Sequence, residues 1–261
     1  MWRQCLIALP QPCLCASQIN AMIMKFVIDL LRPFVRWLCR FWFKAEFHGV
    51  ENIPAEGACL ITPNHTSYAD PIWITVPIRR RVYYMAWDKP FKIPVLGLMM
   101  RIFGAFPVNV ETADVSAHRA AHDALRMGRA LVIFPEGGRT RTGKLMPFKM
   151  GAFRFALTYG VPVVPVSING GEKIWPVGRI FPRAGKLIIT YHPPIAVERL
   201  PDGTSRVELK SQARQLARKT YEAVASAVAP DMLPEARSDT PVPIDRNLMP
   251  ADNVVSTHQA D

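Results

Sequence analysis

The sequence is poor in cysteine and in acidic residues, and it has no long uninterrupted apolar run. Its five cysteines all lie within the first 59 residues, and their spacing matches neither a disulfide framework nor a zinc site with histidines. We therefore expect a reducing compartment and no bound metal. Cys59 lies in the apolar run Ala58-Cys59-Leu60-Ile61 and is expected to be a small core residue.

Acidic residues are scarce relative to basic ones: 21 Asp and Glu face 32 Lys and Arg, which gives a formal charge of +11. Such a surplus predicts an acidic partner, and the three candidates are an anionic membrane surface, a phosphorylated substrate and nucleic acid. Residues 231–261 contain six acidic and two basic residues, so they carry −4 and residues 1–230 carry +15. The basic residues form no recognisable nucleic-acid module with aromatic residues, which disfavours nucleic acid as the partner.

The length of 261 residues is sufficient for one core with additional terminal segments. Residues 1–21 form an uncertain leader, and the better organised segment behind them suggests the hypothesis that translation starts at Met22 or Met24. We expect one catalytic domain over residues 45–229. Residues 230–261 are rich in Pro, Asp, Ser and Asn without apolar periodicity, so they are predicted to be a disordered tail.

Residues 22–44 are apolar but repeatedly interrupted by positive charge. Arg32, Arg36, Arg40 and Lys44 recur every four residues, which places them on one helical face opposite Leu, Phe and Trp side chains. A spanning helix would bury several arginines at a cost of about 2.5 kcal/mol or more each, so the pattern favours helices that lie in a membrane interface, divided at Pro33. The alternative is an amphipathic helix packed on its own domain.

The middle of the chain alternates short apolar runs with helical patterns. This alternation predicts an α/β domain in which helices flank a mixed, mostly parallel sheet. A capping box at Ser205-Arg206-Val207-Glu208 opens a last helix. The predicted strands are 57–62, 82–87, 104–110, 130–134, 162–168 and 186–191, and the predicted helices before the capping box are 70–78, 90–102, 114–127 and 148–158.

The segment Asn64-His65-Thr66-Ser67-Tyr68-Ala69-Asp70 places a histidine five residues before a carboxylate. A histidine takes protons near neutral pH, and a carboxylate on its far nitrogen fixes the tautomer and stabilises the imidazolium. No Gly-x-Ser-x-Gly elbow supplies a serine nucleophile, so a substrate hydroxyl is the simpler nucleophile and a covalent route through Ser67 is less favoured. Alternatively, His65 bonds within a loop and Asp70 caps the following helix.

A second motif, Phe134-Pro135-Glu136-Gly137-Gly138-Arg139, follows the apolar run 130–133. Its glycines let the backbone turn and present N–H groups, while Arg139 and Arg141 can fork onto phosphate oxygens. Glu136 is expected to bond a substrate hydroxyl or to orient Arg139, and Lys149 is a further phosphate candidate. The alternative is an ordinary strand-to-loop turn with solvated arginines.

Four blocks occur in order: Asn64 to Pro71, Lys92 to Asn109, Phe134 to Arg139, and Val161 to Ser167. Together they resemble the 1-acylglycerol-3-phosphate acyltransferase family of glycerolipid acyltransferases, over about residues 45–200. The resemblance implies that fold, with His65 as general base, Asp70 as its partner, and Glu136, Gly137 and Arg139 at the acceptor phosphate. It also implies that the fourth block is structural or lines the acyl site.

The chain departs from the family pattern at two places. The second block usually ends in Asp-Arg, whereas this chain has Asn109-Val110, and the third often has Thr where this chain has Gly138. The expected activity is acyl transfer to 1-acylglycerol-3-phosphate, which makes phosphatidic acid. The alternatives are another lysolipid acceptor, such as a lyso-aminolipid, and a non-catalytic basic protein that binds membranes.

The predicted site joins the catalytic pair His65 and Asp70 to a set of substrate-binding residues. Acyl-CoA or acyl carrier protein is expected to deliver the acyl group as a co-substrate, with no cofactor. The expected location is the cytoplasmic face of a membrane, the inner membrane if the source is bacterial. The predicted substrate-binding residues are Asn64, Glu136, Gly137, Gly138, Arg139, Arg141 and Lys149.

Overall fold

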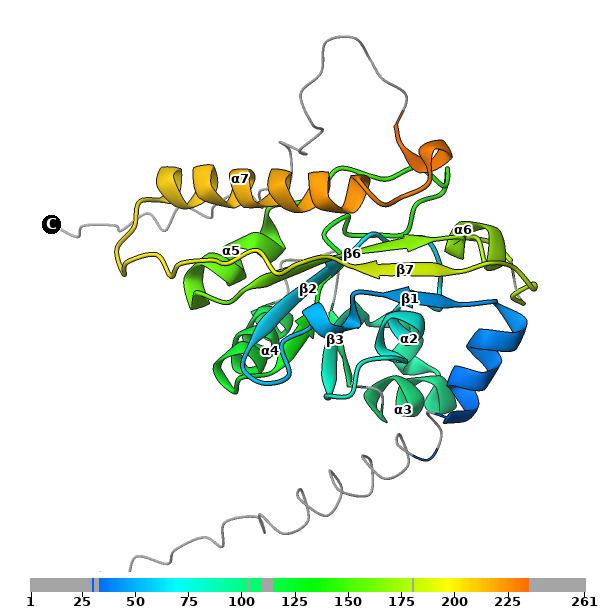
Figure 1. Cartoon of the computed structure of the whole chain (residues 1–261). Helices are drawn as coiled ribbons and strands as arrows, with labels where there is room; N and C mark the ends of the chain where they lie inside the picture. The colour runs from blue at the N-terminus through cyan, green and yellow to red at the C-terminus, as the bar shows by residue number, and fades with distance from the viewer. Residues whose placement is uncertain (1–29, 31–32, 103, 109–114, 180, 235–261) are drawn as a thin grey trace, which may run out of the picture.

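The computed structural model describes residues 30, 33–102, 104–108, 115–179 and 181–234 (Figure 1). Within these residues seven strands form one sheet in the order β1-β7-β6-β2-β5-β3-β4. β6 and β7 are antiparallel and every other pair is parallel, which confirms the predicted mixed, mostly parallel sheet. The strands are β1 Glu46–His48, β2 Cys59–Pro63, β3 Val82–Trp87, β4 Ala105–Val108, β5 Ala130–Val132, β6 Val163–Asn169 and β7 Ile188–Tyr191.

Helices connect the strands and cover both faces of the sheet. The predicted cap of the last helix is confirmed, because the Ser205 side chain accepts a hydrogen bond from the Glu208 N–H. The prediction missed β1 and α6, which are too short to show a periodic pattern. The helices are α2 Asp70–Thr75, α3 Pro94–Ile102, α4 Val115–Arg126, α5 Gly151–Tyr159, α6 Gly171–Ile174 and α7 Arg206–Ala225, with 3-10 turns at Val50–Asn52, Lys89–Lys92 and Pro230–Met232.

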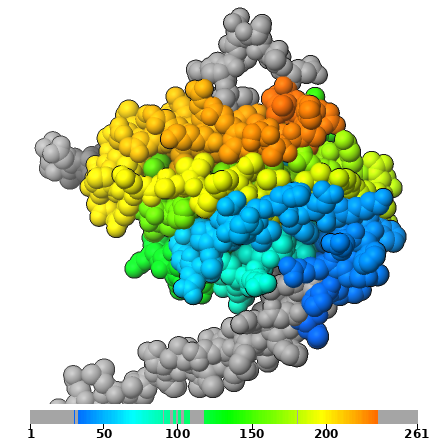
Figure 2. Space-filling view, in the orientation of Figure 1, coloured from blue at the N-terminus to red at the C-terminus, as the bar shows by residue number. Residues whose placement is uncertain are grey.

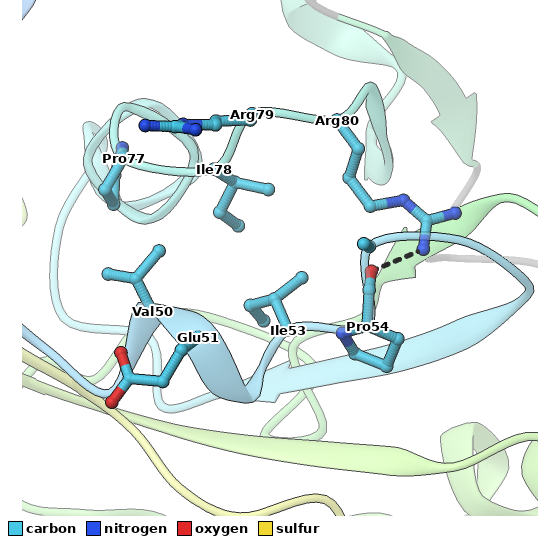
Figure 3. A pocket seen from close by; sticks show the side chains of 9 residues that line it. Val50, Glu51, Ile53, Pro54, Pro77, Ile78, Arg79 and Arg80 are labelled. Carbon is cyan, nitrogen blue, oxygen red and sulfur yellow. Dashed lines mark hydrogen bonds between the residues drawn. The ribbon is translucent and has the colours of Figure 1, made fainter.

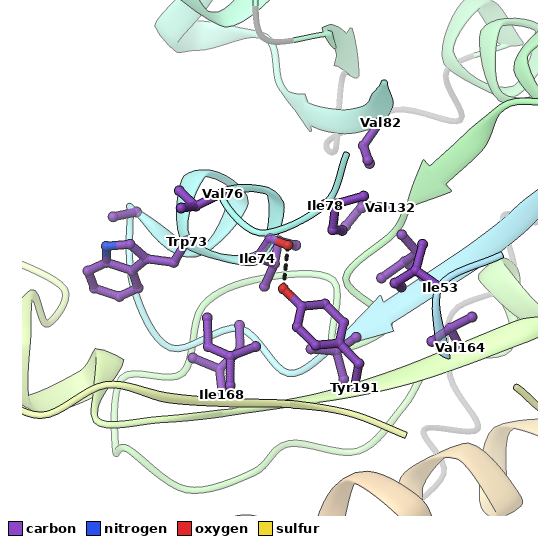
Figure 4. Packing of buried hydrophobic residues seen from close by; sticks show 14 of the residues in the cluster. Ile53, Trp73, Ile74, Val76, Ile78, Val82, Val132, Val164, Ile168 and Tyr191 are labelled. Atoms are coloured by element: carbon purple, nitrogen blue, oxygen red, sulfur yellow. Dashed lines mark hydrogen bonds between the residues drawn. The ribbon is translucent and has the colours of Figure 1, made fainter. Parts of the chain in front are cut away.

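The sheet separates two hydrophobic clusters. Cys59 and Ile61 of β2 face the first cluster, whereas Leu60 between them faces the second, as the two-residue period of a strand requires. Trp73 and Ile74 of α2 lie in the first cluster (Figure 4), where the buried Tyr191 hydroxyl donates to the Ile74 carbonyl at 2.5 Å. Helices α4, α5 and α7 pack in the second. All five residues of β2 are buried, as expected for a strand covered on both faces.

Segments far apart in sequence lie side by side at the surface. Figure 2 shows α7, the segment that contains β7 and the N-terminal part of the described chain as adjacent bands. The pairing of β1 with β7 joins the last two of these bands, since Phe47 lies opposite Ile189. The strands β2, β3, β4, β5 and β6 run parallel to one another, so their carboxyl ends meet at one edge. Both sequence motifs follow these ends.

Residues 33–42 are helical, and this helix has two apolar sides. Cys39 and the following Phe43 are buried against the first cluster, whereas Phe34, Trp37, Phe41 and Trp42 are each more than half exposed. The alternative of a helix packed on its own domain is thus realised for one side. Of residues 22–32 the structure describes only Leu30. The predicted division of the segment into two helices at Pro33 therefore stays a prediction. Among the helices that the structure describes, none has the length and apolar character to cross a bilayer.

The predicted boundary between domain and tail needs correction. Met232 lies in the segment assigned to the tail, yet its side chain is buried in the second cluster and its carbonyl accepts a hydrogen bond from the Leu145 N–H at 2.7 Å. The reason is that the chain turns back through a 3-10 turn at Pro230–Met232, which a search for helical periodicity does not detect. The fold therefore includes residues up to at least 234, and residues 235–261 lie outside the described part.

The packing of α7 predicts the effect of a larger side chain at its buried face. Ala217 of α7 has no exposed surface within the second cluster, so Ala217→Leu should lower the free energy of unfolding by about 1–3 kcal/mol through overpacking. Urea unfolding measures this change. Arg214→Ala on the exposed side of the same helix is the control and should change the free energy by less than about 0.5 kcal/mol. Equal midpoints for the two variants would contradict the described packing.

Candidate active site

The two motifs meet at the carboxyl edge of the sheet because β2 and β5 are parallel neighbours. Ile61 lies opposite Val132, and each motif begins within a few residues of these positions. The chain segments stay together beyond the strands, since the Thr140 N–H donates to the His65 carbonyl at 2.9 Å. The structure therefore brings together residues that are about seventy positions apart in the sequence.

His65 and Asp70 form a hydrogen-bonded pair. The His65 Nδ1 lies 2.9 Å from the Asp70 Oδ2, and the same oxygen accepts from the backbone N–H groups of Thr66 at 2.6 Å and Ser67 at 2.7 Å. Because the ionised carboxylate only accepts, the proton of the neutral ring sits on Nδ1 and the Nε2 lone pair is left available. The Asp70 side chain has no exposed surface, while 16% of the His65 side chain is exposed.

Several contacts fix the orientation of this pair. The Thr66 hydroxyl donates to the Asp70 Oδ1 at 3.2 Å, and the His65 ring stacks on Phe134 with 3.9 Å between ring centroids. Asp70 is also the first residue of α2, where backbone N–H groups lack helical partners and favour a carboxylate. The five-residue spacing thus places Asp70 in the first turn of α2 and bonds it to His65. The alternative that Asp70 caps this helix is wrong, because the N-cap is Ala69 and the Asp70 carboxylate bonds Thr66 and Ser67, which precede the helix.

Asn64 occupies a different position from the one predicted. Its side chain has no exposed surface, its Oδ1 accepts from the Ile168 N–H at 2.7 Å and its Nδ2 donates to the Ile168 carbonyl at 3.0 Å. These bonds replace ladder hydrogen bonds between β2 and β6 just beyond the strand end. We therefore revise its assignment as a substrate-binding residue, because its amide joins two strands and does not face the site.

Glu136 is also buried, and it links the loop after β5 to the loop after β2. Its Oε1 accepts from the His65 N–H at 3.0 Å, and its Oε2 has no hydrogen-bond partner among the described residues. Burial raises the pKa of this carboxyl well above its usual value. The backbone hydrogen bonds from His65 and Met146 lower the pKa, whereas the negative charge of Asp70 raises it further. With 4% of its surface exposed, Glu136 fixes the backbone of His65, a role that the sequence did not indicate.

The basic residues gather around the Gly137 turn. Gly137 has a φ of +71°, and a Cβ there would lie 2.6 Å from the Lys149 Nζ, so the lysine side chain folds over the bare glycine. The Arg139 guanidinium carbon lies 3.4 Å from the centroid of the Tyr68 ring. Gly138 and Arg141 are exposed in the same loop.

Two further residues shape the site without belonging to the predicted set. A Cβ at Gly171, after β6, would collide with the Thr66 hydroxyl and lie 3.2 Å from the Asp70 Oδ1. Tyr68 contacts Arg139 from the loop between His65 and Asp70. The only sequence signal for Gly171 is the adjacent pair Gly170-Gly171 directly after a predicted strand. No group of three His, Cys, Asp or Glu side chains in the described part is placed to hold a metal ion.

A cavity of about 620 Å³ lies at the opposite edge of the sheet (Figure 3). Its walls come from segments that precede β2 and β3, so it contains none of the residues above. Arg80 closes one side, and its guanidinium donates to the carbonyls of Pro54, Gly57 and Gly128. The lining residues are Val50, Glu51, Ile53, Pro54, Ala55, Pro77, Ile78, Arg79 and Arg80.

Comparisons with known proteins agree on one family. Residues 44–169 match the family model described as Acyltransferase. A chloroplastic 1-acyl-sn-glycerol-3-phosphate acyltransferase of Brassica napus is 31% identical over 158 residues, which cover 56% of this chain and 46% of that protein. The enzyme of the same name from Borreliella burgdorferi is 29% identical over 156 residues, covering 59% of this chain and 62% of its own length. The chain thus spans about half the length of the plant relative.

A solved structure shows the same fold. The crystal structure of PlsC, a 1-acyl-sn-glycerophosphate acyltransferase from Thermotoga maritima, superposes with a TM-score of 0.59 at 28% sequence identity. The match covers 78% of this chain and 82% of that one. The predicted glycerolipid acyltransferase fold is confirmed by this agreement.

The raised pKa of Glu136 predicts a pH-dependent stability. Above the usual value of 4.5 the folded state holds this proton more tightly than the unfolded state, so stability falls as pH rises through the folded pKa. Glu136→Gln removes the titration, and its free energy of unfolding relative to the wild type should rise between pH 5 and pH 8 in urea titrations. The exposed Glu198→Gln is the control, with a change below about 0.5 kcal/mol at both pH values. A pH-independent difference for Glu136→Gln would contradict the assignment.

Proposed function

We propose that this chain, whose residues 44–169 match the acyltransferase family model, transfers a fatty acyl group to the free hydroxyl of 1-acylglycerol-3-phosphate, making phosphatidic acid. The observation that carries the proposal is the His65–Asp70 pair, with Nε2 available at the same sheet edge as Arg139 and Lys149. The names of the relatives support the choice of acceptor. The acyl donor is a thioester, acyl-CoA or acyl carrier protein, which acts as a co-substrate without a resident cofactor.

The proposed reaction is a direct attack by the acceptor. The hydroxyl gives its proton to the His65 Nε2 as its oxygen bonds to the thioester carbonyl carbon, which forms a tetrahedral intermediate. The intermediate collapses, the carbon–sulfur bond breaks, and the departing thiolate takes the proton from Nε2. Asp70 stabilises the imidazolium between these steps and keeps Nδ1 protonated. No side chain of the protein forms a bond to the acyl group.

Acceptor binding is assigned to the basic turn. A phosphate monoester needs N–H donors and positive charge, and both occur at Gly137, Arg139 and Lys149. Arg141 and the exposed Gly138 extend this surface. Val110 stands where the family usually has an arginine, so these residues supply the charge in its place.

The helix at residues 33–42 is proposed to hold the enzyme on a membrane surface at its cytoplasmic face. Its exposed side carries Phe34, Trp37 and Phe41, whose rings contact one another with centroids 6.1 and 5.3 Å apart. Arg36 and Arg40 on the same helix are exposed and suit anionic headgroups. A lysolipid acceptor is found in such a surface, which favours an enzyme that works there.

An acyl-transfer assay tests the function. Purified protein in mixed micelles receives labelled acyl-CoA or acyl carrier protein and a panel of lysolipids that includes a lyso-aminolipid. We expect turnover of 1-acylglycerol-3-phosphate and a fall of about 10²- to 10⁴-fold in His65→Ala. His48→Ala, at an exposed histidine of β1, is the control and should keep full activity. Equal rates for His65→Ala and wild type would sink the general-base role, and no turnover with any acceptor and donor would refute the function.

The position of Gly171 gives a second test. Gly171→Ala places a methyl group against the Thr66 hydroxyl and the Asp70 carboxylate, so the His65–Asp70 pair must shift. We expect the turnover number to fall about 100-fold, as is usual for a displacement of about 1 Å at a catalytic group. Gly151→Ala is the matched control, because a Cβ there meets nothing within 4 Å. If the two variants were equally active, the geometry of the pair would not require a glycine at position 171.

A further inference from the structure

Arg139 lacks the partner that a half-buried guanidinium usually has. No ion pair joins it to a carboxylate within the described residues, and one terminal nitrogen, Nη1, is buried without a hydrogen-bond partner. A partly desolvated cation without a counterion is costly. Something in the folded protein must therefore hold this side chain in place before a ligand arrives.

Tyr68 provides that support. The Arg139 guanidinium carbon lies 3.4 Å from the centroid of the Tyr68 ring, which is the contact distance of two stacked planar groups. A cation over the face of an aromatic ring is attracted by the negative face of the ring. The contact uses the face of the guanidinium, so the ring takes up none of the N–H groups at its edge. These edge groups are the ones that form a fork with phosphate oxygens.

The tyrosine is itself fixed from two sides. In the chain it lies directly after Ser67, whose N–H bonds the Asp70 carboxylate, so its backbone is tied to the base and acid pair. Its ring contacts Trp175, with centroids 5.8 Å apart, and the Trp175 indole donates to the Arg179 carbonyl at 2.9 Å. Trp175 also packs against the first core cluster. A contact series thus runs from the core through Trp175 and Tyr68 to Arg139.

We propose that Tyr68 is a positioning residue that holds the guanidinium of Arg139 for an acceptor carrying a phosphate monoester, and so sets the preference for anionic over neutral acceptors. The inference rests on the proposed function. A free arginine side chain loses rotamer entropy when it is fixed, and the contact with Tyr68 imposes this loss before binding. Because Val110 replaces the arginine usual in the family, the orientation of Arg139 carries more of the recognition in this chain.

Steady-state kinetics separate positioning from a general structural role. In Tyr68→Leu the KM for 1-acylglycerol-3-phosphate should rise about tenfold, with the turnover number and the KM for the acyl donor changed less than about twofold. Tyr68→Phe keeps a ring face and should restore the KM to within about threefold of the wild type. A neutral monoacylglycerol acceptor should be used equally well by wild type and Tyr68→Leu. Equal losses with both acceptors would overturn the proposal.

A binding measurement keeps the inference separate from the function. The His65→Ala protein in mixed micelles is titrated with 1-acylglycerol-3-phosphate in a calorimeter, which gives a dissociation constant without turnover. In this His65→Ala background, Tyr68→Leu should weaken binding about tenfold. When Arg139→Ala is also present, Tyr68→Leu should weaken binding no further, since Tyr68 and Arg139 act through one contact. An unchanged dissociation constant would refute the role of Tyr68, even if the enzyme is active. A tenfold change in binding, together with no turnover by the wild-type protein, would support Tyr68 and refute the proposed function instead.

Discussion

The buried carboxylate of Asp70 is the constraint on which the site depends. It has no exposed surface, so each of its oxygens needs partners inside the protein, and it finds them in the Thr66 and Ser67 N–H groups, the Thr66 hydroxyl and the His65 ring. The loop cannot relax without exposing or orphaning these groups. The His65 ring is therefore oriented by the folded protein itself, and the space beside the pair is already filled where Gly171 has no side chain.

The same requirement explains the neighbouring polar residues. Glu136 joins the His65 backbone to the loop after β5, and Asn64 joins the residue before His65 to β6. Each side chain crosses between parallel strands at the point where the ladder hydrogen bonds end, and each satisfies backbone groups that would otherwise be buried without partners. Asn64 and Glu136, which the motifs suggest as substrate ligands, thus link segments of the chain in the folded protein.

The sequence predicted six of the seven strands because their apolar runs are long enough to show a pattern, and it predicted the His65–Asp70 contact because the two residues are local. It did not predict β1 or α6, which contain three and four residues. Nor could it predict the burial of Glu136 or the direction of Asn64, since these depend on partners 71 and 104 positions away. The contact of Tyr68 with Arg139 is of the same kind. Local sequence patterns do not predict which loops come into contact when the sheet forms.

The helix at residues 33–42 resolves the two interpretations of the N-terminal segment into one arrangement. An apolar stripe that ends in Cys39 and Phe43 packs on the first cluster, so the helix is fixed relative to the sheet. A second stripe, Phe34, Trp37 and Phe41, finds no partner within the described residues and remains exposed. An exposed aromatic stripe is unfavourable in water, and here it adjoins basic side chains on a chain whose first 230 residues carry +15. Because the helix is fixed by its first stripe, any surface that binds the second also fixes the orientation of the sheet edge that carries His65.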